Sequence, residues 1–532
     1  MGCVCPRGVA LDRVELICNS TITPSDDPVG DTGGDFALAL YVLERLLITS
    51  QQTPPVAVPV VPHTLRVSSG ERGFSIAFFD ALHALYRRHG ALEFGIAEIC
   101  RVAAHVNVCA FTSATGLSLV ESCLLLAEAE ALDVSGLFGT ASTFFSYSWE
   151  GSSFADVYSA ARRALASDHG RPARDAGDRS GQRFMWLDLL CASQNLLAGR
   201  YEDAEQYPTG SPQSDARKED TDRLFDDALR AATEITVYLA PLVGEWDAPA
   251  HPPLQPEYRG ASAEGLPRRK GPRATTRAWC LFELSSMLAS GGRLRVELPG
   301  RDLAQLEHIL ATEGFSHSGV LATILDGIDA NDAQVSKEKD REFIVRRIRA
   351  AGGFEEVNRT VKRGLREWLY STALASLNEA EVAWRTAQAS MASDDTGTGT
   401  APYQLMSGIG ELLHDMGRYA ESEAVHRRAH DGLTACHSAY HPKVFEAMHG
   451  WAQVLMRLGR HAEAESLCTR ALHGLEDLMG ADDPQTLRAV NQLGCLRLYQ
   501  GAQPAPPALV HARLRLAHTS MTLSKSCRSS CA

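Results

Sequence analysis

Apolar and polar positions follow two different periods along this chain of 532 residues. Between 34 and 137 apolar residues such as Phe78, Leu82 and Leu85 recur every three or four positions, which is typical of amphipathic helices. Between 138 and 300, short runs of β-branched and aromatic residues alternate with helical stretches. The expected strands are 142–147, 183–190, 234–240 and 293–298. This alternation predicts an α/β domain with a parallel sheet that is covered by helices on both faces.

The remaining stretches complete a division into seven regions. The segment from 301 to 392 is helical again, and its 354–390 part is long and amphipathic enough to bridge two domains. The expected regions are a loose leader (1–33), a helical lead-in (34–137), the α/β domain (138–300), a helical bridge (301–392), a linker (393–402), a helical repeat (403–501) and a disordered tail (502–532).

An internal repeat with a period of 42 residues occupies the C-terminal part. The segment 417–421 (GRYAE) recurs as 459–463 (GRHAE), and the pair 441–442 (HP) is followed by 483–484 (DP). Proline is favoured at the first turn of a helix, and small residues let helices approach closely. About two and a half such units therefore predict antiparallel helix pairs stacked as an α-solenoid.

Composition restricts the function and the compartment. The net charge of −13 argues against a general nucleic-acid binder, and no stretch of 18 apolar residues is present to form a transmembrane helix. The thirteen cysteines are dispersed without metal-ligand spacing, so we expect reduced thiols, no metal site and a cytoplasmic location. Membrane attachment is expected only if Gly2, Cys3 and Cys5 are acylated, and Pro6 stands where the acylation pattern requires Ser or Thr.

The stretch 275–288 carries the candidate chemistry. Thr275 and Thr276 are expected to cap a helix whose residues Trp279 and Glu283 lie one turn apart. A carboxylate beside an aromatic ring can hold a cationic or sugar-like ligand. The alternative is an ordinary amphipathic helix with the tryptophan in the core and the glutamate at its rim. Because ligands of parallel sheets bind outside the carboxyl ends of the strands, we expect residues 145–149, the loop after Leu190 and the start of this helix to converge on one cleft.

The order of these motifs resembles that of a Toll-interleukin-receptor (TIR) domain. The carriers of the resemblance are FFSYSW (144–149), FMWLDLL (184–190), ITVYLAP (235–241) and RAWCLFEL (277–284). A later DREFI signature at 340–344, followed by repeats of the kinesin-light-chain type, resembles an arrangement in large protist and algal proteins. The resemblance implies a flavodoxin-like parallel sheet flanked by helical regions and followed by tetratricopeptide repeats.

The resemblance also implies a site. Enzymatic TIR domains hydrolyse NAD at the nicotinamide–ribose bond, and their essential carboxylate maps onto Glu283. Trp149 and Trp279 would wall the pocket for the ring, and Ser148 and Asp188 would hydrogen-bond ribose or phosphate. NAD would be the substrate, and no cofactor is expected. A carboxylate near ribose C1 favours the oxocarbenium-like transition state that forms when nicotinamide leaves.

A non-catalytic scaffold or adaptor is the alternative, because many TIR domains only assemble with one another. The long loops 197–222 and 243–274 favour this alternative. In both hypotheses 403–501 binds a protein partner, and the TIR-like domain is a candidate for self-association. Burial of Glu283 in a salt bridge, without an open cleft at the strand ends, would favour the scaffold. A kinesin subunit is a third idea, but no heptad run is present at the N-terminus to pair with a motor chain.

Overall fold

The computed structural model describes most of the chain between residues 33 and 499. The described residues are 33–52, 68–101, 106–166, 182–194, 223–242, 245–247, 268–312, 324–325, 327–335, 338–389 and 401–499. The expected leader (1–32 of it), the tail (502–532), the loop 197–222 and residues Gly2, Cys3 and Cys5 therefore lie outside the described residues. Among the described residues, no helix combines the length and the apolar character needed to cross a membrane.

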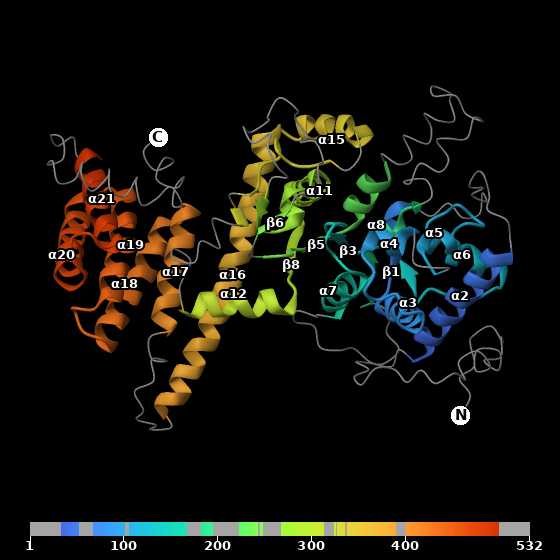
Figure 1. Cartoon of the computed structure of the whole chain (residues 1–532), viewed down its shortest axis with the longest axis horizontal. Helices are drawn as coiled ribbons and strands as arrows, with labels where there is room; N and C mark the ends of the chain where they lie inside the picture. Colours follow the sequence, from blue (N-terminus) through green and yellow to red (C-terminus); the bar gives the residue numbers. More distant parts are fainter. Residues whose placement is uncertain are drawn as a thin grey trace. The chain divides into compact units, whose positions relative to one another are not determined.

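The chain divides into two compact units. The first comprises Met1–Asp302 and Thr323–Gly364, and the second comprises Leu303–Ala322 and Leu365–Ala532. The division falls inside two helices, α12 (Gly300–Thr312) and the long α16 (Phe354–Ala389) (Figure 1). The 36-residue α16 confirms the expected long helix at 354–390.

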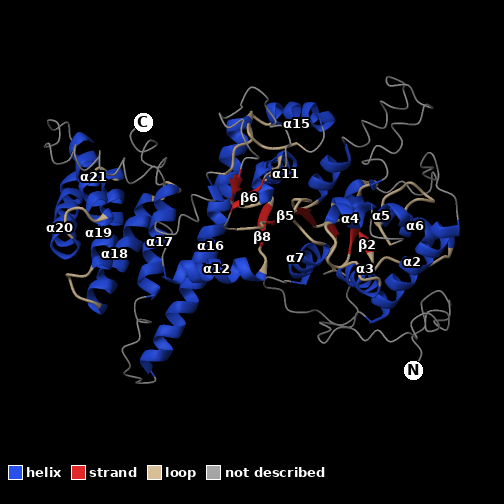
Figure 2. Cartoon of the chain, in the orientation of Figure 1, coloured by secondary structure: helices blue, strands red, loops and turns tan. Residues whose placement is uncertain are grey.

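The first unit is built on a six-stranded sheet with the order β2-β1-β4-β3-β5-β8, whose strands are red in Figure 2. The strands are β1 (Gly73–Phe74), β2 (Phe138–Gly139), β3 (Thr143–Ser146), β4 (Met185–Trp186), β5 (Glu234–Tyr238) and β8 (Arg293–Glu297). The four strands β4-β3-β5-β8 are parallel, as predicted, and Thr143 pairs with Met185 in the parallel register.

The sheet as a whole is mixed, which corrects the expectation of a purely parallel sheet. Strands β1 and β2 pair antiparallel with each other, and β1 pairs antiparallel with β4. Strand β1 lies within 34–137, which was expected to be a helical lead-in only. Strands of two residues are too short for their alternation to appear in the sequence, and only pairing with distant strands defines them.

Helices cover both faces of the parallel strands, as the alternation predicted. On one face, Arg163 of α7 (Phe154–Ala166) pairs with Glu297 of β8 at 2.8 Å. On the other face, Ser146 of β3 contacts Glu283 of α11 (Ala278–Ala289). Successive residues of a strand point to opposite faces, so Phe144 shares the α11 face with Ser146.

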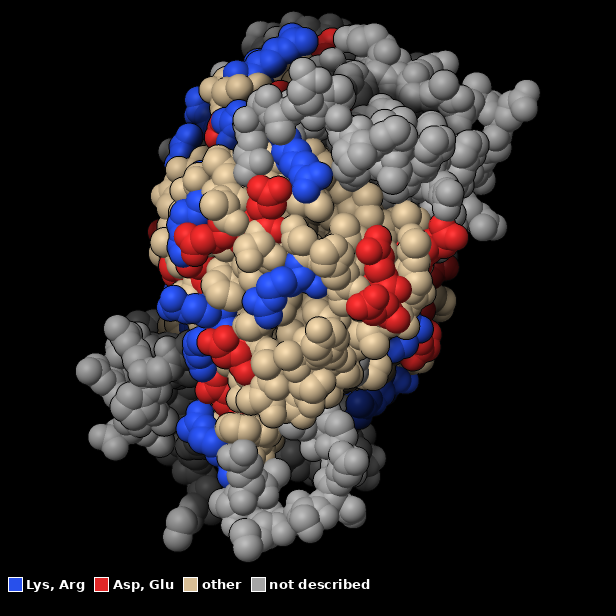
Figure 3. Space-filling view, turned by 90° about the vertical axis from the view of Figure 1, so that its left-hand side faces the viewer, with Lys and Arg blue, Asp and Glu red and all other residues tan. Residues whose placement is uncertain are grey.

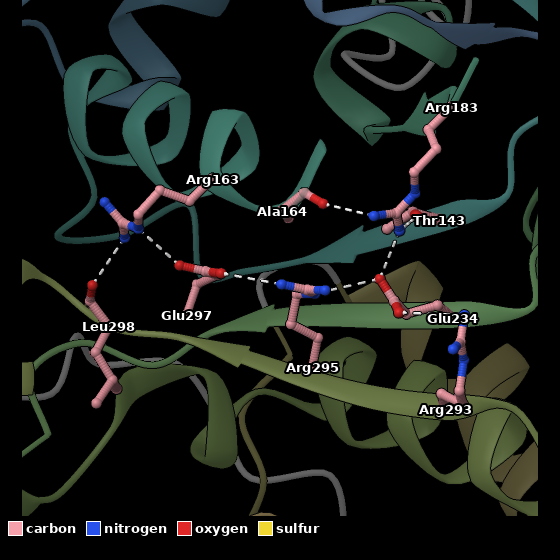
Figure 4. Close-up of polar contacts among 9 residues, drawn as sticks. All are labelled: Thr143, Arg163, Ala164, Arg183, Glu234, Arg293, Arg295, Glu297 and Leu298. Atoms are coloured by element: carbon pink, nitrogen blue, oxygen red, sulfur yellow. Dashed lines mark hydrogen bonds and ion pairs between the residues drawn. The ribbon is translucent and has the colours of Figure 1, made fainter. Parts of the chain in front are cut away.

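A network of charged side chains lies on the α7 face (Figure 4). The carboxylate of Glu234 is buried and pairs with Arg183 at 2.8 Å, with Arg295 at 3.3 Å and with Arg293 at 3.6 Å. Arg295 also lies 3.9 Å from Glu297. A buried carboxylate is stable only when it is paired in this way, so the network joins β5, β8 and the segment before β4.

The lead-in region contributes five helices that pack against the sheet and one another. They are α2 (Gly33–Gln52), α3 (Ile76–Arg88), α4 (Ile96–Arg101), α5 (Val108–Phe111) and α6 (Leu119–Ala129). The predicted stripe of Phe78, Leu82 and Leu85 is buried on α3. Ser118 and Glu121 form a reciprocal capping box at the start of α6, which fixes where this helix begins.

Several short elements were not predicted. The segments 69–71 and 273–276 are 3₁₀ turns, η1 (Ser69–Glu71) and η4 (Arg273–Thr276). A small antiparallel ribbon, β6 (Glu245–Asp247) and β7 (Arg268–Lys270), lies within the expected loop 243–274. The short helix α8 (Asp188–Cys191) replaces the second half of the expected strand 183–190. The helix α15 (Glu338–Ala350) lies in the segment 301–392, which was predicted to be helical.

The second unit contains the predicted helix pairs. They are α17 (Ala401–Asp415), α18 (Tyr419–Cys436), α19 (Pro442–Arg457), α20 (His461–Met479) and α21 (Pro484–Tyr499). Gly417 and Gly459 have φ of +76° and +77°, which glycine adopts at helix ends without strain. The two prolines begin α19 and α21, as predicted.

Repeated close contacts hold these helices together. A Cβ at Gly432 would lie 2.2 Å from the ring of Tyr403, and one at Gly474 would lie 2.0 Å from the ring of Phe445. The two contacts are equivalent positions of the repeat. The surface is charged, with pairs such as Arg460–Glu463 at 2.6 Å, and acidic and basic side chains are interspersed on the face drawn in Figure 3.

Candidate functional site

The centre of the candidate site is a hydrogen bond between the sheet and α11. Ser146 is the last residue of β3, and its Oγ donates to Oε2 of Glu283 at 2.6 Å. Ser146 is 1% exposed and Glu283 is 7% exposed. Because α11 packs onto the parallel strands, a carboxyl group on its inner side is forced into the region where β3 ends.

Burial changes the acidity of this carboxyl group. Desolvation raises the pKa of Glu283 from 4.5 to about 8, the Ser146 hydrogen bond opposes this rise, and the nearby charge of Asp188 adds to it. At pH 7 the larger part of the Glu283 carboxyl population is therefore protonated. A cationic ligand would favour the ionised form and draw the group into its charged state.

A second carboxylate lies at the same edge of the sheet. Asp188 begins α8 and lies two residues after the end of β4, which is the parallel neighbour of β3. Its Oδ1 accepts a hydrogen bond from the Tyr147 hydroxyl at 2.9 Å, and its Oδ2 accepts one from Trp149 Nε1 at 2.8 Å. Burial raises the pKa of Asp188, and the hydrogen bonds from Tyr147 and Trp149 oppose the rise.

Ser148 lies in the turn after β3, and its hydroxyl makes a hydrogen bond within that turn. Its Oγ donates to the backbone oxygen of Glu150 at 3.2 Å, and the residue is 5% exposed. Glu150 also lies 3.6 Å from Arg277, the residue that precedes α11. The turn and the start of α11 are thus tied together by an ion pair.

Trp279 lies in an aromatic cluster between α11 and α15. Its ring stacks on Phe225 at a centroid distance of 4.9 Å and lies 5.5 Å from Phe343. Its Nε1 donates to Asp340 Oδ2 at 3.1 Å, so the 340–344 motif contacts the tryptophan. The ring therefore packs on other aromatic side chains.

The predicted threonine cap of α11 is wrong. The hydroxyls of Thr275 and Thr276 donate to the backbone oxygens of Pro272 and Arg273, at 2.7 and 2.9 Å, because both residues belong to η4 and not to α11. The start of α11 is held by the Gln334 backbone instead. Its oxygen accepts from Ala278 N at 3.1 Å, and its nitrogen donates to Thr276 O at 2.8 Å.

The structure therefore brings four predicted residues, Ser148, Trp149, Asp188 and Glu283, to the carboxyl ends of β3 and β4, and it places Trp279 in the aromatic cluster. The sequence placed Ser146 and Tyr147 at the expected cleft with the rest of 145–149, but it gave neither residue a role of its own. Strand alternation would have indicated Ser146, because it shares a face with Phe144 and the helix that covers that face. Among the described residues, no group of three or more His, Cys, Asp or Glu side chains is arranged to hold a metal ion.

Comparison with known proteins identifies the second unit. Residues 443–505 match the tetratricopeptide repeat family. The chain thus carries tetratricopeptide repeats near its C-terminus, together with a small mixed sheet in a mostly helical first unit. No curated protein matches the chain.

The solved structures that resemble the chain include a BtubC protein and two forms of a putative kinesin light chain. BtubC (BKLC) from P. vanneervenii is 14% identical with a TM-score of 0.25, over 48% of this chain and 75% of that one. A putative Podosopora anserina kinesin light chain with nearly identical TPR-like repeats is 13% identical with a TM-score of 0.22, over 31% and 75%. A substituted form of that light chain is 16% identical with a TM-score of 0.22, over 47% and 98%.

Proposed function

We propose that the first unit contains a TIR-like domain that hydrolyses NAD at the nicotinamide–ribose bond, and that the tetratricopeptide repeats recruit a protein partner. The observation that carries the proposal is the buried Ser146–Glu283 pair at the carboxyl end of β3. The glutamate is the residue that the resemblance assigns to catalysis, and it lies where ligands of parallel sheets bind.

The order of the parallel strands supports this domain assignment. In chain order β3, β4, β5 and β8 are the first to fourth parallel strands, and they lie side by side as second, first, third and fourth. This order belongs to the flavodoxin-like class of doubly wound sheets. Its crevice opens between the first and third strands, here β3 and β5, and Ser146 is the residue with which β3 ends at this point.

The proposed hydrolysis requires a negative charge on Glu283 when the ribose cation forms. When the C1–N bond to nicotinamide breaks, its electron pair leaves with the ring nitrogen and the ribose C1 becomes cationic. Ionised Glu283 would stabilise this cation while a water oxygen bonds to C1 and releases a proton. The positively charged nicotinamide ring of NAD would lower the pKa of Glu283 on binding and so favour the ionised form.

The test is direct incubation of the purified full-length chain with NAD and measurement of nicotinamide by chromatography. The chain should be assayed both in solution and clustered on a surface, because assembly is the alternative property of such domains. Release by the wild type and its loss in Glu283→Gln would support the proposal. No release from the wild type in either state would contradict it.

The non-catalytic scaffold is the second candidate, and the packing of Trp279 favours it. The indole ring of Trp279 stacks on Phe225, as expected for a residue whose role is structural. In this case Glu283 would only anchor α11. Sedimentation of the full-length chain over a range of concentrations tests self-association, and association without nicotinamide release would favour the scaffold.

The role of the repeats is argued separately. Tetratricopeptide repeats typically mediate protein–protein interaction, since each helix pair leaves a face open beside its neighbour. We assign partner binding to 403–501. A chain that lacks 401–532 should lose the partner in a pull-down while keeping the first unit folded, as judged by its circular dichroism. Undiminished recovery of the partner would contradict this assignment.

A further inference from the structure

Both carboxylate oxygens of Asp188 accept hydrogen bonds from groups of the same chain. Oδ1 accepts from the Tyr147 hydroxyl and also from Leu189 N at 2.7 Å, and Oδ2 accepts from Trp149 Nε1. An indole N–H can only donate, so Trp149 requires an acceptor at this position. A carboxylate supplies acceptors on both oxygens, whereas an amide of the same size supplies one.

These bonds join the two strand ends that form the candidate site. Asp188 follows β4, and Tyr147 and Trp149 follow Ser146 at the end of β3. The backbone of Asp188 is also held in place, because its oxygen accepts hydrogen bonds from Gln194 Nε2 at 2.6 Å and from Ala192 N at 3.1 Å. We call the hydrogen bonds from Tyr147 and Trp149 to Asp188 the clamp. It is anchored on α8, because the backbone of Asp188 is itself held by hydrogen bonds.

The same segment is connected to the helix that carries Glu283. The backbone oxygen of Tyr147 accepts a hydrogen bond from Cys280 Sγ at 3.3 Å, one turn before Glu283 on α11. A displacement of Tyr147 would thus move Ser146, which precedes it on the strand, and Cys280, which lies one turn before Glu283 on the helix. We propose that Asp188 is a positioning residue, which holds the 147–149 segment so that Ser146 and Glu283 keep their geometry for the proposed hydrolysis.

This inference rests on the proposed function and differs from the expected role of Asp188 as a ligand of ribose or phosphate. Both oxygens of Asp188 already accept hydrogen bonds from the chain itself, two on Oδ1 and one on Oδ2, so the carboxylate is held in place before any substrate arrives. Asp188 would affect the reaction in two ways. Its hydrogen bonds would hold the geometry of the Ser146–Glu283 pair, and its negative charge would change the acidity of Glu283.

The experiment uses two variants that remove the same hydrogen bond from opposite sides, Asp188→Asn and Trp149→Phe, with Tyr147→Phe as a control that leaves the indole bond intact. The first readout needs no substrate. In ¹H–¹⁵N spectra of the full-length chain, the Trp149 indole N–H, assigned by its absence in Trp149→Phe, should shift and exchange faster with solvent in Asp188→Asn but not in Tyr147→Phe.

The second readout is nicotinamide release. We expect Asp188→Asn and Trp149→Phe each to lower kcat about 10-fold, and the double variant to lose little more than either one, because both remove one interaction. The pH midpoint of the rate should move to lower pH only in Asp188→Asn, since that variant alone removes a negative charge near Glu283. A purely structural role would move the midpoint equally in both variants.

The outcomes separate the two proposals. An unchanged Trp149 indole signal in Asp188→Asn would overturn the clamp, and a changed signal with full kcat would overturn its positioning role. Absence of nicotinamide release from the wild type would overturn the proposed hydrolysis, and with it the role of the clamp in catalysis, while the indole signal would still establish whether the clamp exists.

Discussion

Ser146 Oγ and Glu283 Oε2 lie 2.6 Å apart although their residues are 137 positions apart in the chain. The bond connects the end of β3 to the inner side of α11, and it is the point at which the sheet and the candidate chemistry meet.

Glu283→Gln should abolish most of the proposed activity and leave the fold intact. Glutamine keeps the size and the hydrogen bond to Ser146 but cannot supply a negative charge to the ribose cation. A preorganised group of this kind is worth on the order of 10²-fold in rate. Nicotinamide release at saturating NAD measures the effect, and Glu128→Gln, a change at an exposed glutamate, is the control. Equal release by wild type and Glu283→Gln would remove Glu283 from the chemistry.

The value of kcat/KM, which reports the free protein, should rise with pH to a plateau with its midpoint at about 8, because the reactive form of Glu283 is the ionised one and its pKa is raised to about 8. Ser146→Ala should move this midpoint to still higher pH, since the hydrogen bond from Ser146 lowers the pKa of Glu283. Initial rates over pH 6 to about 10, with the binding of NAD followed separately, give the midpoint. A flat profile would contradict this reasoning.

Glu283→Gln should also change how the stability of the first unit depends on pH. The pKa of Glu283 is near 4.5 in the unfolded chain and about 8 in the folded one, so the folded state binds more protons between these values. Its contribution is complete below pH 4.5 and is lost as pH rises to 8, by up to about 1.4 kcal/mol per pH unit. Amide hydrogen exchange of α11 measures the change. The glutamine variant should lack this slope, and an identical slope in both proteins would contradict the burial argument.

His426 makes the second unit sensitive to acid. The residue is 1% exposed, and added Cβ atoms at Gly410 and Gly450 would lie 2.6 and 2.5 Å from its ring. Burial, and then the charges of His414 and His449, lowers its pKa from 6.5 to about 3. The unfolded chain therefore binds the extra proton below pH 6.5, and the stability of the helix pairs should fall as pH falls from 6.5 to 3, by up to about 1.4 kcal/mol per unit.

His426→Leu should remove this part of the pH dependence, whereas His473→Leu, at an exposed histidine, should not. Amide exchange of α18 and α19 between pH 4 and about 7 is the measurement, with rates corrected for the intrinsic effect of pH. An equal slope in wild type and His426→Leu would show that the buried ring is not the cause.

Gly474→Ala should destabilise the repeat unit by about 1–3 kcal/mol, because the new methyl group would lie 2.0 Å from the Phe445 ring in a packed core. A smaller partner, Phe445→Leu, should recover part of the loss in the double variant, and the coupling energy from denaturant unfolding measures it. The same loss in Gly474→Ala with and without Phe445→Leu would show that this contact is not the source.

The sequence alone determined the features that depend on neighbouring residues. The β-branched and aromatic runs at 142–147 and 234–240, separated by helical stretches, predicted parallel strands because both faces of such a sheet are covered by helices. The 42-residue recurrence predicted the helix pairs, since Gly417 and Gly459 end helices and Pro442 and Pro484 begin them through local backbone preferences. The FFSY motif and Glu283 were likewise recognisable, and Trp149 and Asp188 from two of the quoted motifs do meet at one edge of the sheet.

Only the tertiary structure decided which of these side chains meet. In the folded chain Glu283 accepts its hydrogen bond from Ser146 and not from Ser148. The Trp279 indole donates to Asp340, which is 61 positions away, and β1 and β2 join the sheet as antiparallel strands. Such contacts depend on how helices and strands distant in the chain pack together, and a pattern with a period of two or four residues contains no information about that packing.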